Sequence, residues 1–312
     1  MKAVIILCGK VGPNIEYTNL GQLPKIFKNA DLVSIDLDGP ITENNLAWPL
    51  KANIQKFRPK EIGWIKQLNV KHATLANYHI MDYRQRGIID TIKYLNSLGI
   101  QFTGAGINKE NASNTHIYKF DTQWIGIISC TVECREWKAG EVNSGIFNIT
   151  SSREIIEKIA TIKPLCKLII LHFHYKTLTD KIKDIMHEVI HAGVDIIQGY
   201  TDKIGPIEVV QRYTTDQNGQ LIRSTPGIIL YSLGNLLSDE TCIASITINF
   251  ETLNRNIELV PVHVVDKKIK LIANSDLKYQ KIINSFKGPV PSFKGPVPSL
   301  PHNNHEVDQT SS

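Results

Sequence analysis

The sequence lacks any apolar run long enough to export the chain or to anchor it in a membrane. Near the start of its 312 residues, only 3–8 form a continuous apolar stretch. A signal peptide needs an apolar region of about 7–15 residues, and a membrane-spanning helix needs about 20. Leu7, which precedes Cys8, is too large for a lipoprotein cleavage site. We therefore expect a cytoplasmic protein without direct membrane insertion, in which 3–8 form a buried strand.

Charge of one sign is not concentrated anywhere in the chain. The 35 Lys and Arg residues exceed the 30 Asp and Glu residues by 35 − 30 = 5, and they are scattered. A surface for nucleic acid would need this positive charge gathered on one face. We expect no nucleic-acid partner.

Cysteine is scarce and irregularly spaced. The chain has five cysteines, an odd number, and Cys130 and Cys134 form a C-x3-C pair that no second pair follows. This arithmetic gives no support for a disulfide framework and argues against a structural zinc site. We expect reduced thiols in core strands.

Apolar residues, by contrast, make up 42% of the chain, and many fall in short runs followed by turn-forming residues. Runs of four to six apolar residues are typical of strands buried on both faces. Helical periodicity lies between the runs, and one helical segment ends at Gly99, a residue suited to helix C-termini. The predicted strands are 4–7, 32–35, 72–75, 124–129, 168–171, 194–197 and 228–231, and the predicted helices are 84–98, 152–159 and 180–191.

This alternation predicts an α/β fold with layered mixed sheets flanked by helices. The late segments 243–250 and 257–265 alternate between apolar and polar residues and are expected to be antiparallel strands. Asn218-Gly219 lies between β-prone residues and predicts a hairpin, because the favoured two-residue turn needs positive φ.

The composition changes towards the end of the chain. The string SFKGPVP occurs twice in tandem, at 285–291 and 292–298, and a polar run follows it. Gly, Pro and Lys at this density bury too little apolar surface to offset the entropy of ordering the backbone. We therefore predict one domain over residues 1–280 and a flexible Gly/Pro-repeat tail over 281–312.

Polar side chains gather where the predicted strands end. Asp36 and Asp38 follow one strand and His172 and His174 follow another, with the members of each pair two residues apart and so on one side of an extended chain. Ligands of α/β sheets bind beyond the carboxyl ends of strands. A single pair could cap a turn or be satisfied in the core, but several together favour a shared pocket. The other polar residues at strand ends are Lys10, Asn77, His79, Asp202, Lys203 and Asn235.

In the same order along the chain, these segments resemble motifs of the CapA-type poly-γ-glutamate capsule synthesis proteins. Residues 30–42 resemble the family's "aD-NLEgPlT" element, and 75–82 are similar to "LANNHxxD". The resemblance covers roughly residues 1–240. It implies a fold related to calcineurin-like metallophosphoesterases and a role in the synthesis of a capsule polymer. Further similarities are those of 104–108 to "GaGxN", 171–173 to "HWG", 191–199 to "aGaDlViG" and 206–208 to "qpiE", while 231–235 match "YSLGN" outright.

The resemblance also implies a site for divalent metals, but the sequence departs from it at most ligand positions. Lys10 replaces the aspartate of "GD", Tyr78 replaces the second Asn of "NNH", and GYTDK at 199–203 replaces "GHHPH". Asp38, a shorter carboxylate, stands for the Glu of "NLE", and His172 keeps the His of "HWG".

These departures argue against a dinuclear centre. At an effective dielectric of about 20, a dication 4 Å from one lysine is repelled by roughly 8 kcal/mol. We expect no cofactor. The alternative is a single divalent metal, Mn, Fe or Zn, held by Asp38, His172 and His174.

Two lysines, Lys10 and Lys203, are expected to replace the positive charge of the metals. They would neutralise Asp36 and Asp38 in an inert network or, with Asn235, bind an anionic small molecule or polymer through a phosphate or a glutamyl carboxylate. The function we expect is an accessory or anion-binding protein of capsule-polymer synthesis, with a capsule-synthesis protein as a partner.

Two enzymatic alternatives stay open at this point. The first is an active metal-dependent phosphoesterase-like hydrolase with His79 as general acid. The second is a metal-independent enzyme that uses His172 or His79 as its base. No Ser or Cys has the G-x-S-x-G context of a nucleophile elbow, and Gly104-Ala105-Gly106 lacks the third glycine of a dinucleotide fingerprint.

Overall fold

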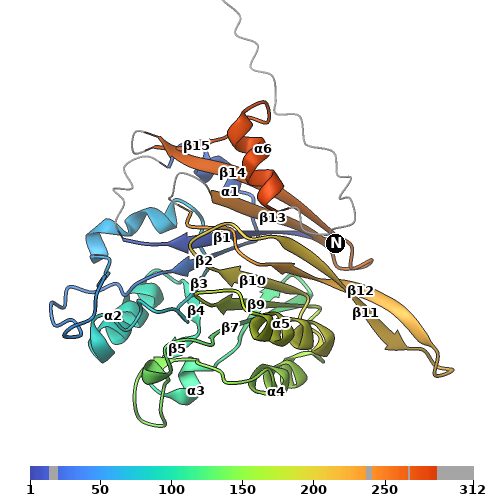
Figure 1. The fold of residues 1–312 in the computed structure, drawn as a ribbon, viewed down its shortest axis with the longest axis horizontal. Coiled ribbons are helices and arrows are strands. Elements are labelled where there is room, and N and C mark those ends of the chain that lie inside the picture. Colours follow the sequence, from blue (N-terminus) through green and yellow to red (C-terminus); the bar gives the residue numbers. More distant parts are fainter. Residues whose placement is uncertain (14–19, 237–240, 266–267, 287–312) are drawn as a thin grey trace, which may run out of the picture.

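The computed structural model describes residues 1–13, 20–236, 241–265 and 268–286. Up to α5, helices are interspersed among the strands, and nearly all later elements are strands (Figure 1). The strands are β1 (Lys2–Val11), β2 (Leu32–Leu37), β3 (His72–Thr74), β4 (Gln101–Thr103), β5 (Ala105–Gly106), β6 (His116–Phe120), β7 (Gln123–Thr131), β8 (Gly145–Ile146), β9 (Leu168–His174), β10 (Ile196–Tyr200), β11 (Ile207–Thr215), β12 (Leu221–Leu230), β13 (Thr241–Asn249), β14 (Arg255–Val265) and β15 (Lys268–Leu271). The helices are α1 (Leu23–Phe27), α2 (Arg84–Ser97), α3 (Lys109–Ala112), α4 (Arg153–Ile162), α5 (Asp180–Ala192) and α6 (Leu277–Ser285), with short 3-10 turns at Pro59–Glu61, Gly63–Lys66 and Arg135–Trp137.

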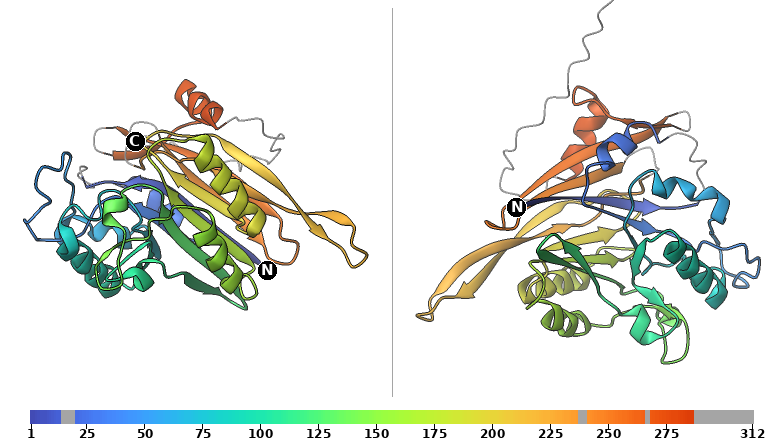
Figure 2. Two further views of the ribbon diagram at one scale, coloured as in Figure 1. Left: turned by 60° about the horizontal axis from the view of Figure 1, so that its bottom comes forward. Right: turned by 180° about the vertical axis from the view of Figure 1, so that it is seen from behind.

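Two mixed sheets pack face to face (Figure 2). The first has the strand order β15-β14-β13-β1-β2-β3-β4, with β1 to β4 parallel and β13 to β15 antiparallel. The second has the order β11-β12-β10-β9-β7-β6, with a parallel centre and antiparallel edges. The α/β class and the late antiparallel strands are thus confirmed.

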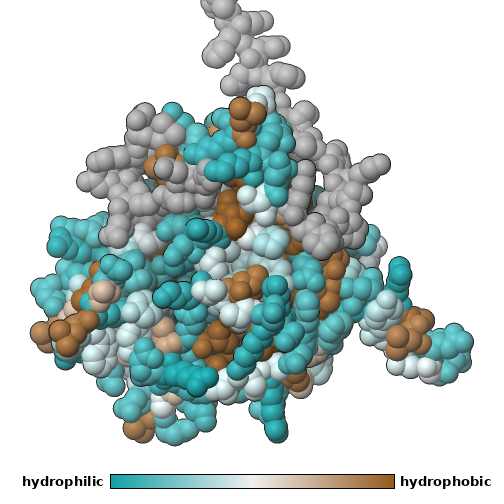
Figure 3. Space-filling model, viewed as in Figure 1, coloured by the Kyte–Doolittle hydropathy of each residue, from teal (hydrophilic) through white to brown (hydrophobic). Residues whose placement is uncertain are grey.

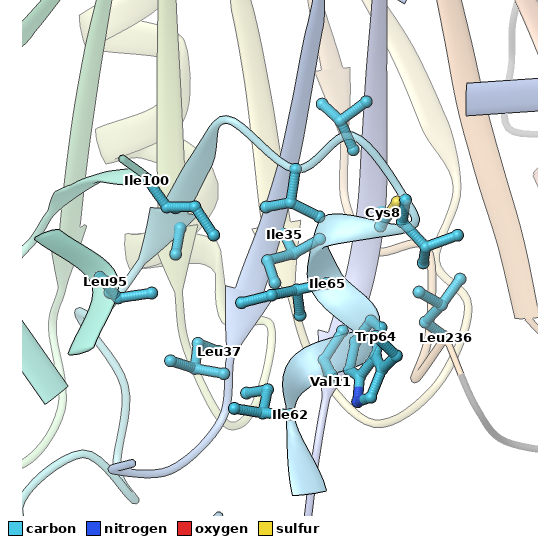
Figure 4. Close-up of a cluster of buried hydrophobic side chains, with 14 of the residues drawn as sticks. Cys8, Val11, Ile35, Leu37, Ile62, Trp64, Ile65, Leu95, Ile100 and Leu236 are labelled. Carbon is cyan, nitrogen blue, oxygen red and sulfur yellow. The ribbon is translucent and has the colours of Figure 1, made fainter. Parts of the chain in front are cut away.

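The alternation of side chains along β1 explains the layers. Ala3, Ile5 and Leu7 point into the core between the sheets, whereas Ile6 and Cys8 point to the outer face of the first sheet. Residues of the 3-10 turn Gly63–Lys66 and of α2 cover that outer face (Figure 4). α4 and α5 cover the outer face of the second sheet. Each central strand is therefore buried on both sides, as the continuous apolar runs predicted.

The predicted hairpin is present as β11 and β12, with Gly219 at φ +79° in its turn. It projects beyond the body of the molecule (Figures 1 and 2). Over the face seen in Figure 3, apolar side chains form separate small groups, some of them at the end of this hairpin. No helix among the described residues combines the length and the apolar character needed to cross a membrane.

The domain boundary predicted at residue 281 falls inside α6. Ile282 of this helix and Phe286 after it are buried in the core between the sheets, and the carbonyl of Phe286 accepts a hydrogen bond from Ile207 N (3.2 Å). The ordered fold therefore extends at least to residue 286. The rest of the SFKGPVP repeat lies outside the described residues.

Candidate functional site

The site lies where the carboxyl ends of strands from both sheets meet. β1, β2 and β3 contribute from the first sheet, and β9 and β10 contribute from the second. Lys10 pairs with Asp36 across β1 and β2, after an irregularity in register that follows Leu7. The strand ends thus bring together residues that are far apart in the chain, as the sequence predicted.

The YSLGN motif fixes the backbone around Lys10. Lys10 N donates to Gly234 O (3.0 Å), and Leu236 N donates to Lys10 O (2.8 Å). Gly234 has φ +79°, and a Cβ on Gly9 would lie 1.9 Å from Gly234 O. Only glycine allows this close approach at position 9, so the motif acts here as a backbone support for the site.

Lys10 joins two carboxylates at the centre of the site. Its ammonium lies 3.0 Å from Asp38 Oδ2 and 2.9 Å from Asp202 Oδ1. The side chains of Lys10 and Asp38 are only 10% and 5% exposed, whereas that of Asp202 is 85% exposed. Burial works against the charged amine, but Asp38, Asp202 and Asp36 together raise the pKa of Lys10 above its ordinary value. The ammonium is therefore a permanent charge of the site.

Asp36, Asp38 and His174 offer donor atoms that all lie within 4.8 Å of one another. His174 Nε2 is 3.9 Å from Asp36 Oδ2. Burial, with the neighbouring Asp38, raises the pKa of Asp36 well above its usual range. Burial, with Lys10 nearby, lowers the pKa of His174 to about 3, so this imidazole is neutral.

Asn77 and Asp82 hold two other side chains of the site. Asn77 Nδ2 donates to Asp36 Oδ1 (3.0 Å), and its Oδ1 accepts from His79 N (3.1 Å). Asp82 Oδ2 lies 2.7 Å from Nδ1 of His79. The other ring nitrogen of His79, Nε2, is hydrogen-bonded to the side-chain amide nitrogen of Gln55 (3.1 Å). His79 is thus in the pocket, as predicted, with both ring nitrogens already bonded.

His172 departs from the prediction. It is 1% exposed and lies between the sheets, where it bonds Ser34 Oγ (3.0 Å) and Tyr200 OH (2.8 Å). His172 and His174 do share one side of β9, but two residues of a strand span about 6.6 Å. Only His174 therefore reaches the end of the strand, and Asp36 replaces His172 in the group of three donors. The same burial removes His172 as a candidate base.

Lys203 also departs from the prediction. It is exposed and does not line either of the two cavities at this site. The preceding residue, Asp202, reaches Lys10 instead, from the bend that follows β10. Asn235 does lie at the site, in a parallel bridge with Lys10.

Two cavities of about 550 and 490 Å³ open at the site. Lys10, Asn53, His79 and Asp202 line both of them. The larger one is also lined by Asp38, Gln55 and Asn235, and the smaller one by His174. Sequence reasoning missed Asn53 and Gln55, which belong to an irregular loop without periodicity.

The residues present do not fit a two-metal centre. The described residues contain one group of three donors, and a lysine ammonium contacts Asp38 within it. A dication there would meet a fixed positive charge at short range, with a repulsion of several kcal/mol. Four buried side-chain atoms of this group have no hydrogen-bond partner among the described residues, namely Asp36 Oδ2, Asp38 Oδ1 and both ring nitrogens of His174. The countercation of the group is Lys10, which contacts Asp38 Oδ2.

Comparison with known proteins gives a consistent result. The sequence model of the family described as "Bacterial capsule synthesis protein PGA_cap" matches residues 13–240. The "PGA biosynthesis protein CapA" of Bacillus subtilis is 25% identical over 225 residues, which are 69% of this chain and 55% of that protein. The "Probable polyglutamine synthesis accessory protein" of Mycobacterium tuberculosis is 24% identical over 239 residues, 70% of this chain and 59% of that protein. This chain thus matches little more than half the length of these relatives.

The fold is also found among solved structures. The NAD nucleotidase of Haemophilus influenzae superposes with a TM-score of 0.52 at 13% identity, covering 91% of this chain and 55% of that one. At this identity the likeness concerns the fold alone. It confirms the layered α/β architecture, with mixed sheets flanked by helices, that was expected from the sequence.

Proposed function

Because the chain belongs to the family of bacterial capsule synthesis proteins described as PGA_cap, we propose that it is an accessory protein of capsule-polymer synthesis that binds a polyanion. The polymer we propose is poly-γ-glutamate, on the basis of the names of the relatives. One observation carries the proposal. The cation at the centre of the site is the ammonium of Lys10, 3.0 Å from Asp38, in a group that would otherwise suit a metal.

The lining of the larger cavity supports an amide-linked polyacid as ligand. Lys10 supplies an ammonium, which suits carboxylates and phosphates as a point charge. Asn53, Gln55 and Asn235 supply side-chain amides, each with donor and acceptor atoms. A γ-glutamyl chain presents carboxylates and amides in alternation and so matches both kinds of group.

The arrangement does not favour hydrolysis. A fixed ammonium neutralises carboxylates that would bind a metal, and His79 already bonds Asp82 and Gln55. No side chain of the site then activates a water through a metal. We therefore propose that the ligand is bound and not turned over.

Two measurements test the proposal. Isothermal titration calorimetry with a tetramer of γ-linked glutamate should give saturable binding that is lost in Lys10→Met, with inorganic phosphate as a competing anion. Hydrolysis of p-nitrophenyl phosphate with added Mn²⁺ should stay at background. Turnover that is lost in Asp38→Asn would replace this proposal by that of an active metal-dependent hydrolase.

Two further expectations stay predictions. One is a protein partner from the same synthesis machinery, which affinity purification of the tagged chain from its own cells would test. The other is a cytoplasmic location, which fractionation of those cells would test.

A further inference from the structure

The two carboxylates that contact Lys10 are very different in exposure. Asp38 is 5% exposed and belongs to the buried end of the first sheet, whereas Asp202 is 85% exposed. Separating Asp38 from Lys10 would leave a buried carboxylate without its cation, and this has a large cost in free energy. Moving Asp202 away would return its carboxylate to water, where an exposed ion pair is worth little. Asp202 is thus the exchangeable partner of Lys10.

The backbone around Asp202 is held in place while its side chain is free to turn. Thr201 N donates to Ser232 Oγ (3.3 Å), and Thr201 Oγ1 donates to Lys203 O (2.9 Å). Among the described residues, the Asp202 carboxylate has one ion-pair partner, Lys10 at 2.9 Å, and this contact lowers the pKa of Asp202. A rotation about its side-chain bonds can therefore release Lys10 without unfolding the turn.

Asp202 also stands at the junction of the two cavities, because it lines both together with Lys10. Its carboxylate therefore contacts the ammonium next to both cavities. A ligand carboxylate that pairs with Lys10 from either cavity would compete with Asp202 Oδ1 for it.

We propose that Asp202 is a built-in competitor: its carboxylate occupies the anion subsite of Lys10 and yields to a carboxylate of the bound polymer. The inference rests on the proposed function and deepens it, since it assigns the ligand group at Lys10 as a carboxylate. An intramolecular occupant keeps the buried ammonium paired in the free protein and raises the concentration of ligand needed to fill the site.

The test compares the affinity of four proteins for a tetramer of γ-linked glutamate by isothermal titration calorimetry. Asp202→Asn removes the competing charge and should lower Kd about fivefold, the factor that an exposed ion pair provides. Asp202→Glu keeps a carboxylate within reach and should stay within about twofold of the wild type. Asp184→Asn, an equal loss of charge at an exposed position of α5, is the matched control and should also stay within about twofold.

The outcomes separate the two proposals. If Asp202→Asn binds no more tightly than the wild type while Lys10→Met has lost binding, the competitor is refuted and the proposed function stands. If the wild type does not bind the tetramer, the proposed function fails. Should Lys10→Met not fold, the test uses a second ligand instead, a γ-linked glutamate tetramer whose free carboxylates are all converted to carboxamides. Binding of this neutral chain as tight as that of the acid by the wild type would refute the carboxylate subsite.

Discussion

At the scale of single residues, one substitution changes the chemistry of the site. Lys10 stands beside Asp38 in a group with Asp36 and His174 that otherwise offers three metal donors. An ammonium and a divalent ion both neutralise carboxylates, but only the ion can polarise a bound oxygen or acidify a water. Lys10 therefore preserves the electrostatic balance of the site and removes the Lewis acid.

This argument predicts that Lys10→Asp creates a metal site. The change removes the positive charge and adds a fourth donor to the three present. Four donors make a tetrahedral set for Zn²⁺ or, with water as further ligands, part of an octahedral set for Mn²⁺. Without metal, three neighbouring carboxylates repel one another, and the variant should be less stable than the wild type. Added Mn²⁺ should bind in near-stoichiometric amount, measured by elemental analysis, and raise the Tm by several degrees.

The control is Lys10→Met, which removes the charge without adding a donor and should bind metal more weakly than Lys10→Asp. Stoichiometric metal in the wild-type protein, lost on Asp38→Ala, would contradict the role assigned to Lys10.

Most of the residues of the site could be predicted, because their positions follow from strand ends. Asp38, His79 and Asn235 lie where the sequence placed them. Which of two neighbouring polar residues enters the site could not be predicted in the same way. Whether Asp202 or Lys203 faces the site depends on the backbone conformation of the bend after β10. Whether His172 or His174 faces it depends on where β9 ends.

At the scale of elements, the sequence predicts strands well where they are buried on both faces. β1, β2, β7 and β9 contain the apolar runs that predicted them, and β10 begins at Ile196, within the predicted run 194–197. The short pair β5 and β8 and the edge strand β6 have no such run and were not predicted. The loop that carries Asn53 and Gln55 has positive φ angles at Leu50 and Asn53, and no sequence pattern predicts this conformation.

Gly9 gives the element-scale prediction. Its position in β1 lies against the backbone of Gly234, and a Cβ would meet Gly234 O at 1.9 Å. Because both contacting groups belong to backbone, neither can move aside as a side chain would. We expect Gly9→Ala to lower the free energy of unfolding by about 3 kcal/mol, near the upper end for overpacked sites, as measured by urea denaturation.

Gly63→Ala is the matched control, since nothing lies within 4 Å of a Cβ there, and its free energy of unfolding should change by less than about 0.5 kcal/mol. Equal stability of the two variants would show that β1 and the YSLGN loop can separate without cost.

At the scale of the whole molecule, a buried polar seam joins the two sheets. Ser34 Oγ of the first sheet bonds His72 Nδ1 (2.8 Å) in its own sheet and His172 Nε2 (3.0 Å) in the other, and the rings of these two histidines stack at 5.4 Å. Tyr200 OH continues the seam to His172 Nδ1 (2.8 Å). Packing of the sheets thus depends on imidazoles that stay neutral inside the core.

The seam makes stability depend on pH in a direction that can be derived. Burial lowers the pKa of His172 to about 3, and burial, followed by the charge of Lys10, lowers that of His174 to about 3, from an ordinary 6.5. Between these values the unfolded chain binds more protons than the folded one, so the free energy of unfolding falls as the pH is lowered below 6.5 and levels off above it. Burial also lowers the pKa of His72, so this histidine adds to the fall in the free energy of unfolding at low pH. Burial and the charge of Asp38 raise the pKa of Asp36, so Asp36 opposes that fall.

From pH 7.5 to pH 5.5 we expect His172 and His174 together to reduce the free energy of unfolding by about 3 kcal/mol. Urea denaturation at the two pH values measures this reduction in the free energy of unfolding. His172→Gln should be less stable overall but should lose about 1.4 kcal/mol of this dependence, the share of one histidine. His191→Gln, at an exposed position of α5, should leave the dependence unchanged. A pH dependence in His172→Gln equal to that of the wild type would contradict the assignment of His172 as an imidazole that stays neutral in the folded protein.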